Sequence, residues 1–354
     1  MQKKGIVLQP SKFISYMQSQ YRVQGKVLGD SITAGVASEG YFLTEEAIGK
    51  TGRFVASQTS TCWTNLFNRQ VETLFQGETF LSIQDAQAQF TSTWQYKRMF
   101  YAGSAALFLT TVEKTVLAEF QIETTEMNIY FTKQAGSGIV AIYLDDVLYC
   151  QEDLYSKEEL NQFKIEIRNL SDKQHNIKIK LVGWNPQSAS SRIYFEGITI
   201  PKKVSFKNWA ITGATAEFLR YYIGDLIEEE DTLILIQIGT NDRLLPNKHQ
   251  LKNNLMAIID YILEQGKDIL LLGSIPMSDN TENLNFTTAE VNVILKETAK
   301  LYNSELIDCH NFFKKLEKNG QLILGDEFLD EIHPTQKVHQ KLYECIWQAL
   351  ELPI

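Results

Sequence analysis

The stretch Thr232-Leu233-Ile234-Leu235-Ile236-Gln237-Ile238-Gly239-Thr240-Asn241-Asp242 decides the fold class of this chain. It starts as a short apolar run, which is typical of a strand buried on both faces of a parallel sheet, and it ends in polar residues. Residues 268–273 repeat the apolar run. Segments with helical spacing lie between and after the two runs, at 216–228, 250–264, 288–302 and 335–350. This alternation predicts an α/β domain in which helices cover both faces of a parallel sheet.

The N-terminal part of the chain adds a strand and a helix of the same kind. The apolar pair Val27-Leu28 precedes Gly29-Asp30-Ser31, and residues 63–75 have apolar positions at helical spacing. We therefore predict that one α/β domain is built from both ends of the chain, residues 1–76 and residues 204–354.

Residues 77–203 follow a different period. Apolar and polar residues alternate over 164–168 and 176–181, and turn residues such as Gly136-Ser137-Gly138 and Asn185-Pro186 separate the alternating segments. Short strands with regular turns are typical of an antiparallel sandwich. We expect an inserted β-sandwich, jelly-roll-like in its arrangement, over 77–203.

The overall composition narrows the functional class. The chain of 354 residues has 34 Lys and Arg against 43 Asp and Glu, which gives a formal net charge of -9. Proteins that bind nucleic acid or anionic membranes through general electrostatics are usually basic, so we predict neither partner. No apolar run reaches the roughly 20 residues of a membrane span. Self-association stays open.

The cysteines and the N-terminal residues indicate in which cellular compartment we expect the protein. Cys62, Cys150, Cys309 and Cys345 are far apart and form no C-x-x-C pair, which fits free thiols in a reducing compartment and leaves one disulfide open. After Met1-Gln2-Lys3-Lys4 there is no apolar stretch long enough for a secretory signal. We expect a cytoplasmic protein.

The residues that could do chemistry follow strands. Sites in open parallel sheets form beyond the carboxyl ends of the strands. Ser31 can act as a nucleophile, His333 as its base, and Asp330, three residues earlier, can orient the imidazole. Gly213 frees a backbone N–H and Asn241 offers an amide donor, so that, with the Ser31 N–H, three donors can face an oxyanion.

This set of residues resembles the SGNH (GDSL) hydrolases, a family of esterases and lipases. The matching pieces are Gly29-Asp30-Ser31, Gly213, Gly239-Thr240-Asn241-Asp242 and Asp330-Glu331-Ile332-His333. The resemblance covers the predicted α/β part and implies a flavodoxin-like three-layer fold and hydrolysis of an ester through a serine acyl-enzyme. By the same resemblance Ser31, Gly213, Asn241 and His333 take the four family roles and Asp330 completes the triad. Ala210 stands where many members carry another glycine.

Each of these residues also has a structural interpretation. Ser31 could cap the helix that follows it, Asn241 and Asp242 could form an Asx turn, and His333-Pro334 could be an ordinary turn before a helix. We interpret Asp30 and Asp242 as residues that brace loops. No H-E-x-x-H motif or Cys/His cluster occurs, so we predict no metal and no cofactor.

The insert is rich in aromatic residues, on which sugar rings could stack, although most of them fit a sandwich core equally well. They are Trp94, Tyr96, Phe100, Tyr101, Tyr130, Tyr143, Tyr149, Tyr155, Trp184 and Tyr194. In pattern the insert resembles the carbohydrate-binding modules of some bacterial carbohydrate esterases. It could also act as a lid or a dimerisation surface.

Three functions follow from these observations. The first is a carbohydrate esterase that removes a short acyl group, acetyl above all, from a small-molecule or oligosaccharide substrate. Small residues after Ser31, and Trp209 as a wall of a compact acyl pocket, favour it. The second is a lipid-directed esterase or lysophospholipase, and the third is a glycan-binding protein without catalysis.

Overall fold

The computed structural model describes residues 4–82, 89–90, 94–97, 105–108, 116–188, 190–277 and 284–353. The chain divides into two compact units, Met1–Gln76 with Lys203–Ile354, and Gly77–Lys202. The second boundary differs by one residue from the predicted one. Lys203 pairs with Arg22 in the parallel sheet and therefore belongs to the α/β unit.

The α/β unit is organised by a parallel sheet. Its strands are β1 (Arg22–Gly29), β15 (Lys203–Asn208), β16 (Leu233–Gln237) and β17 (Asp268–Leu271), in the order β15-β1-β16-β17. A parallel bridge between Leu272 and Ile307 adds a fifth position beyond β17. In chain order this arrangement is 2-1-3-4-5, the flavodoxin-like order, so the predicted fold class is confirmed.

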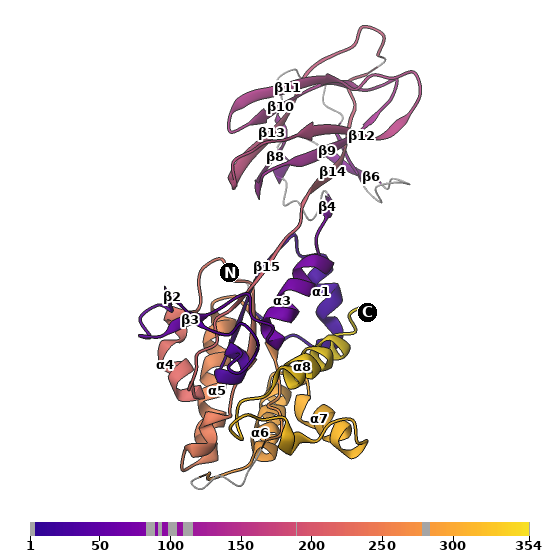
Figure 1. Cartoon of the computed structure of the whole chain (residues 1–354). Coiled ribbons are helices and arrows are strands. Elements are labelled where there is room, and N and C mark those ends of the chain that lie inside the picture. The colour runs from indigo at the N-terminus through magenta and orange to yellow at the C-terminus, as the bar shows by residue number, and fades with distance from the viewer. Residues whose placement is uncertain are drawn as a thin grey trace. The chain divides into compact units, whose positions relative to one another are not determined.

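Alternation along the strands divides the apolar side chains between two cores. Leu233 and Leu235 face one side of the sheet, and Ile234 and Ile236 face the other. The first core is closed by α1 (Phe13–Ser19), α3 (Trp63–Leu74), α7 (Cys309–Lys318) and α8 (Gln336–Ala349). The second is closed by α4 (Ala216–Leu226), α5 (Lys248–Glu264) and α6 (Thr288–Leu301). Figure 1 shows α3 beside α8, which contact each other.

The predicted helices agree with α3, α4, α5, α6 and α8 to within two residues at each end. The smaller elements of this unit connect the main ones. They are η1 (Pro10–Lys12), α2 (Ser31–Ala34), the antiparallel pair β2 (Leu43–Ala47) and β3 (Phe54–Ala56), η2 (Asn241–Leu244) and η3 (Leu324–Asp326). Among the described residues, none of the helices is both long and apolar enough to cross a lipid bilayer.

The second unit contains two antiparallel sheets. One has the order β11-β10-β13-β8-β5, and the other has the order β12-β9-β14-β7-β6, with β4 also paired to β14. The strands are β4 (Glu78–Ser82), β5 (Gln89–Phe90), β6 (Trp94–Lys97), β7 (Ala105–Phe108), β8 (Val116–Thr124), β9 (Met127–Lys133), β10 (Gly138–Leu144), β11 (Val147–Asp153), β12 (Leu160–Ile167), β13 (Lys173–Trp184) and β14 (Ile193–Pro201).

Aromatic contacts join these two sheets into one core. The rings of Phe120 on β8 and Phe195 on β14 stack with their centroids 6.3 Å apart, and Phe90 on β5 meets Phe108 on β7 at 5.6 Å. Of the aromatic residues singled out from the sequence, Tyr194 is buried, whereas Trp94, Tyr149 and Trp184 are exposed. Phe100, Tyr101 and the side chain of Tyr96 lie outside the described residues.

Candidate active site

The candidate residues gather at the carboxyl edge of the parallel sheet. Ser31 follows β1 directly, and Asn241 follows β16 after three intervening residues. These two strands are neighbours, and the chain leaves them toward opposite faces of the sheet, which makes their ends a topological switch point. The crevice that forms there is the usual ligand site of such sheets.

Ser31 is the first residue of α2. The cap of that helix is Asp30, whose Oδ1 accepts the backbone N–H of Ile32 at 3.0 Å. Burial raises the pKa of Asp30, although hydrogen bonds from Thr240 and Ile32 act against the rise. The capping role that the sequence left open for Ser31 therefore belongs to Asp30, and the Ser31 hydroxyl is free for another partner.

That partner is His333. Its Nε2 lies 2.9 Å from Ser31 Oγ, and its Nδ1 lies 2.7 Å from Asp330 Oδ2. A carboxylate can only accept, so Nδ1 carries the proton and Nε2 is left to accept the hydroxyl of Ser31. The three side chains form a continuous relay from an exposed carboxylate to a serine that is only 3% exposed.

The loop that carries Asp330 and His333 is held in a tight turn. Asp330 Oδ1 accepts the backbone N–H of His333 at 2.7 Å, and Glu331 between them has a left-handed φ of 66°. Phe328 forms an antiparallel bridge with Pro334, and Leu329 N–H donates to His333 O at 3.0 Å. Burial alone would raise the pKa of Asp330, but the hydrogen bonds from His333 lower it below the usual value.

The predicted oxyanion donors lie on the two loops beside this relay. Gly213 has a φ of 78°, and a Cβ at this position would meet nothing within 4 Å, so conformation rather than space requires glycine here. Asn241 Nδ2 donates one hydrogen to Ala214 O at 2.9 Å, which fixes the amide and leaves its second hydrogen. Ala210 is buried and donates its backbone N–H to Asn208 Oδ1 at 3.2 Å.

Residues 184–341 match the GDSL-like Lipase/Acylhydrolase family. This part of the chain resembles the GDSL-like lipases and acylhydrolases. The match confirms the SGNH (GDSL) family predicted from sequence, and its range includes Gly213, Asn241, Asp330 and His333. Ser31 precedes that range, and the fold of the α/β unit brings it to His333.

Solved structures similar to this chain include three esterases. A peptidoglycan O-acetylesterase is 13% identical, with 97% of this chain and 95% of that chain covered and a TM-score of 0.41. An acetylxylan esterase from Geobacillus stearothermophilus is 19% identical, with 43% and 74% covered and a TM-score of 0.37. Another acetyl xylan esterase is 16% identical, with 41% and 80% covered and a TM-score of 0.36. No curated protein matches the chain in sequence.

Asp242 braces the loops that carry the predicted oxyanion donors. Both of its carboxylate oxygens lie 3.1 Å from the backbone N of Ala216, at the start of α4 and three residues after Gly213. Burial, together with the neighbouring charge of Asp30, raises the pKa of Asp242 to about 7. The interpretation of Asp30 and Asp242 as loop-bracing residues is confirmed.

Asn208 and Gln237 also position the site, and sequence reasoning missed them. Asn208 Nδ2 donates to Thr33 O at 3.2 Å, which ties the end of β15 to α2. Gln237 Oε1 accepts the hydroxyl of Thr33 at 2.9 Å, and its Nε2 donates to Gly273 O at 3.1 Å. Both residues are polar and each ends a buried strand. This position at a strand end could have identified them from the sequence.

His339 is a second histidine close to the site. It is fully buried on α8, and its Nε2 lies 3.5 Å from Val36 O in the turn after α2. Burial lowers its pKa to about 4, and the nearby His333 acts in the same direction. His339 is therefore a packing residue of the core beside α2.

Trp209 does not wall the acyl pocket, and that prediction was wrong. The indole is buried in the core beside α4, with the Lys26 ammonium 4.0 Å from its ring centroid. Lys26 itself is fully buried on β1 and pairs with Glu228 at 3.0 Å and Asp231 at 3.1 Å. Trp209 lies one residue past the Val27–Asn208 pair, so strand alternation turns it toward this core.

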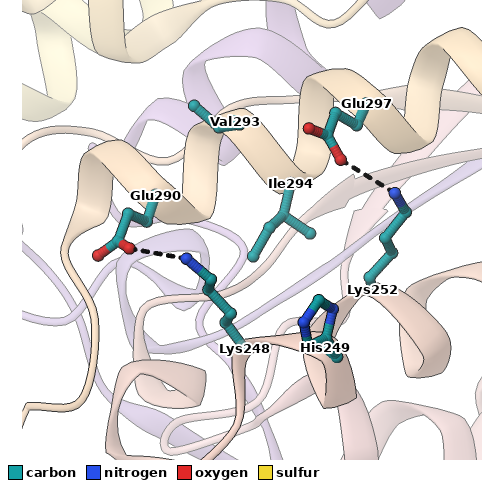
Figure 2. Close-up of a pocket in the computed structure, with 7 residues that line it drawn as sticks. All are labelled: Lys248, His249, Lys252, Glu290, Val293, Ile294 and Glu297. Carbon is teal, nitrogen blue, oxygen red and sulfur yellow. Dashed lines mark hydrogen bonds and ion pairs between the residues drawn. The ribbon is translucent and has the colours of Figure 1, made fainter.

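Two further histidines belong to other groups of titratable side chains. His175 in the second unit is buried against Asp145, with Nδ1 and Oδ2 2.9 Å apart. His249 lines a hollow between α5 and α6, where Lys248 pairs with Glu290 and Lys252 with Glu297 (Figure 2). Over the part of the chain that the structure describes, no group of three or more His, Cys, Asp or Glu side chains could hold a metal ion.

Proposed function

We propose that the protein is a serine esterase that hydrolyses a short-chain acyl ester, an acetyl ester above all, of a carbohydrate through a serine acyl-enzyme. The observation that carries the proposal is the relay Asp330–His333–Ser31, with separations of 2.7 and 2.9 Å. Such a relay in a GDSL-like lipase/acylhydrolase domain supports catalysis over glycan binding alone.

In the first half-reaction, Ser31 Oγ bonds to the ester carbonyl carbon while its proton passes to His333 Nε2. The carbonyl π electrons move onto oxygen, and the Ser31 N–H, Gly213 N–H and Asn241 amide stabilise that oxyanion. Asp330 stabilises the imidazolium. The carbon–oxygen bond to the alcohol then breaks, the alcohol takes the proton from Nε2, and the acyl group stays on Ser31.

In the second half-reaction, water replaces the alcohol. His333 accepts a proton from the water as its oxygen bonds to the acyl carbon, and a second oxyanion forms at the same three donors. The bond to Ser31 Oγ breaks, Oγ regains the proton, and the carboxylic acid leaves. No step needs a group other than these side chains, the ester and water.

A short acyl group is supported by the small residues around α2. Ala34 ends the helix and packs in a buried cluster with Ala56 and Ala210, so small side chains surround the turn after Ser31. A lipid-directed esterase is the second candidate, because Leu244 and Leu329 are 58% and 70% exposed on the segments that also carry Asn241 and Asp330.

The test is hydrolysis of p-nitrophenyl esters by the wild type and by Ser31→Ala. The variant should lose activity by ~10³-fold or more while its thermal unfolding stays cooperative. Ser60→Ala, at another buried serine, is the matched control and should keep its activity. Unchanged hydrolysis by Ser31→Ala would remove the serine mechanism. A preference for C8 over C2 esters would favour the lipid-directed candidate.

A further inference from the structure

A hollow of about 320 Å³ opens on the α/β unit, at the same edge of the sheet as the proposed catalytic residues. We call it the Phe328 groove. It is lined by Pro276, Met277, Lys314, Glu317, Leu324, Gly325, Phe328 and Glu331. Its volume lies within the range of ordinary small-molecule sites.

One wall of the groove belongs to the loop of the proposed triad. Glu331 directly follows Asp330, and Phe328 bridges Pro334, which directly follows His333. A ligand that touches these two side chains is therefore close to the loop from which the imidazole reaches Ser31.

Another part of the lining connects to the proposed oxyanion donor. Met277 lies in the segment after β17, and its sulfur is 2.9 Å from Nη2 of Arg243. Arg243 is buried in η2, the turn that begins with Asn241. The lining thus includes both the segment that carries the proposed base and a residue held against the turn of Asn241.

The lining has the chemistry of a site for a hydroxylated ring. Phe328, Met277 and Leu324 offer an apolar floor for C–H groups, and the exposed Glu317, Lys314 and Glu331 offer acceptors and a donor for hydroxyls. Lys314 pairs with Glu317 at 3.3 Å, so Glu331 is left as one net negative charge. This carboxylate repels an anion.

We propose that the Phe328 groove binds the alcohol part of the ester and that this alcohol is a neutral, polyhydroxylated ring rather than an anionic one. The inference rests on the proposed function and adds the charge class of the substrate. It places the leaving alcohol beside the loop of His333, whose Nε2 must protonate it. A phosphate-bearing or carboxylate-bearing alcohol would meet the charge of Glu331.

The test compares two substrates that differ in one carboxylate, mono-O-acetyl methyl glucoside and mono-O-acetyl methyl glucuronide, with p-nitrophenyl acetate as reference. The wild type should prefer the glucoside by roughly ten-fold in kcat/KM at low salt, and added salt should shrink that ratio. The double variant Glu317→Gln with Glu331→Gln should lower the ratio several-fold, mainly through KM. Glu317→Gln alone, on the exposed face of α7, should also lower this glucoside-to-glucuronide ratio.

The matched control removes the same charge elsewhere. Glu297→Gln with Glu344→Gln breaks two surface ion pairs with lysines, at 2.9 and 2.7 Å, and should leave the glucoside preference as in the wild type. If the glucoside-to-glucuronide ratio of kcat/KM is the same in the wild type and in both groove variants, the proposed role of the Phe328 groove is overturned. An equal fall of that ratio in the control variant would overturn it as well. If Ser31→Ala keeps hydrolysing p-nitrophenyl acetate, the proposed function fails. If p-nitrophenyl acetate hydrolysis depends on Ser31 but neither sugar ester reacts, only the groove and the carbohydrate substrate fail.

Discussion

One carboxylate, that of Asp330, holds both the backbone and the ring of His333: Oδ1 accepts the backbone N–H at 2.7 Å, and Oδ2 lies 2.7 Å from Nδ1. The imidazole therefore has little freedom to turn away from Ser31 or to exchange tautomers. We expect Asp330→Asn to lower kcat for p-nitrophenyl acetate by ~10³ to 10⁴-fold, because an amide can donate to Nδ1 and reverse the tautomer. Asp326→Asn, at an exposed aspartate of η3, is the control, and equal rates for the two variants would contradict the role of Asp330.

Asn241 allows a test of the oxyanion donors that does not touch the relay. We expect Asn241→Ala to raise the barrier by ~3 kcal/mol, or 10²- to 10³-fold in kcat, with little change in KM, because the donor acts on the developing charge. Steady-state kinetics on acetyl esters would measure both constants. The exposed Asn319→Ala is the control, and a change confined to KM would show that Asn241 only binds substrate.

Asp242 should make stability depend on pH near neutrality. Its pKa is raised to about 7 in the folded state, so the folded state binds a proton more tightly than the unfolded state and loses stability as pH rises toward 7. We expect Asp242→Asn to gain roughly 2–3 kcal/mol relative to the wild type between pH 5 and pH 8. Urea unfolding at the two pH values measures this difference, and a constant difference would refute the raised pKa.

His339 should make the folding stability depend on pH in the opposite direction to Asp242. Its pKa is lowered to about 4 in the folded state, so its contribution is complete above the unfolded value near 6.5 and is lost as pH falls toward 4. The wild type should lose about 2 kcal/mol from this group between pH 7.5 and pH 5, and His339→Gln should not. Chemical denaturation gives the comparison, with the exposed His249→Gln as control. If the free energy of unfolding depends on pH in the same way for His339→Gln and the wild type, the lowered pKa of His339 is contradicted.

The ends of the second unit lie next to each other, because Lys202 N–H donates to Gly77 O at 2.7 Å. We expect a chain that lacks residues 77–202, with Gln76 joined to Lys203 by a short Gly/Ser linker, to keep the parallel sheet and unfold cooperatively. Circular dichroism and thermal unfolding would measure this. Aggregation of the shortened chain under conditions in which the full chain is soluble would show that the α/β unit needs the second unit.

The sequence correctly predicted those elements whose own residues indicate that they are buried. The apolar runs at 232–236 and 268–272 identify buried strands wherever they occur, and polar residues directly after them lie at the functional edge. Ser31, Gly213 and Asn241 were placed in this way, together with the three-layer fold. Asp330 and His333 were also expected after a strand, but they follow η3.

The missed features depend on which elements pack together. Trp209 is an apolar side chain after a strand, and only the register of β15 on β1 shows that it covers the Lys26 ammonium instead of the site. The capping role of Asp30 and the burial of His339 against Val36 require the backbone path through α2. The Phe328 groove joins segments that have no shared period or spacing, so no pattern in the sequence indicates it.

The strand order also fixes when the sheet can form during synthesis on the ribosome. β1 takes both of its hydrogen-bonding neighbours, β15 and β16, from residues that follow the second unit. A nascent chain must therefore keep β1 unpaired until translation has passed the whole of residues 77–202. The unit in the middle of the gene product is complete, and can fold, before the unit that begins the chain.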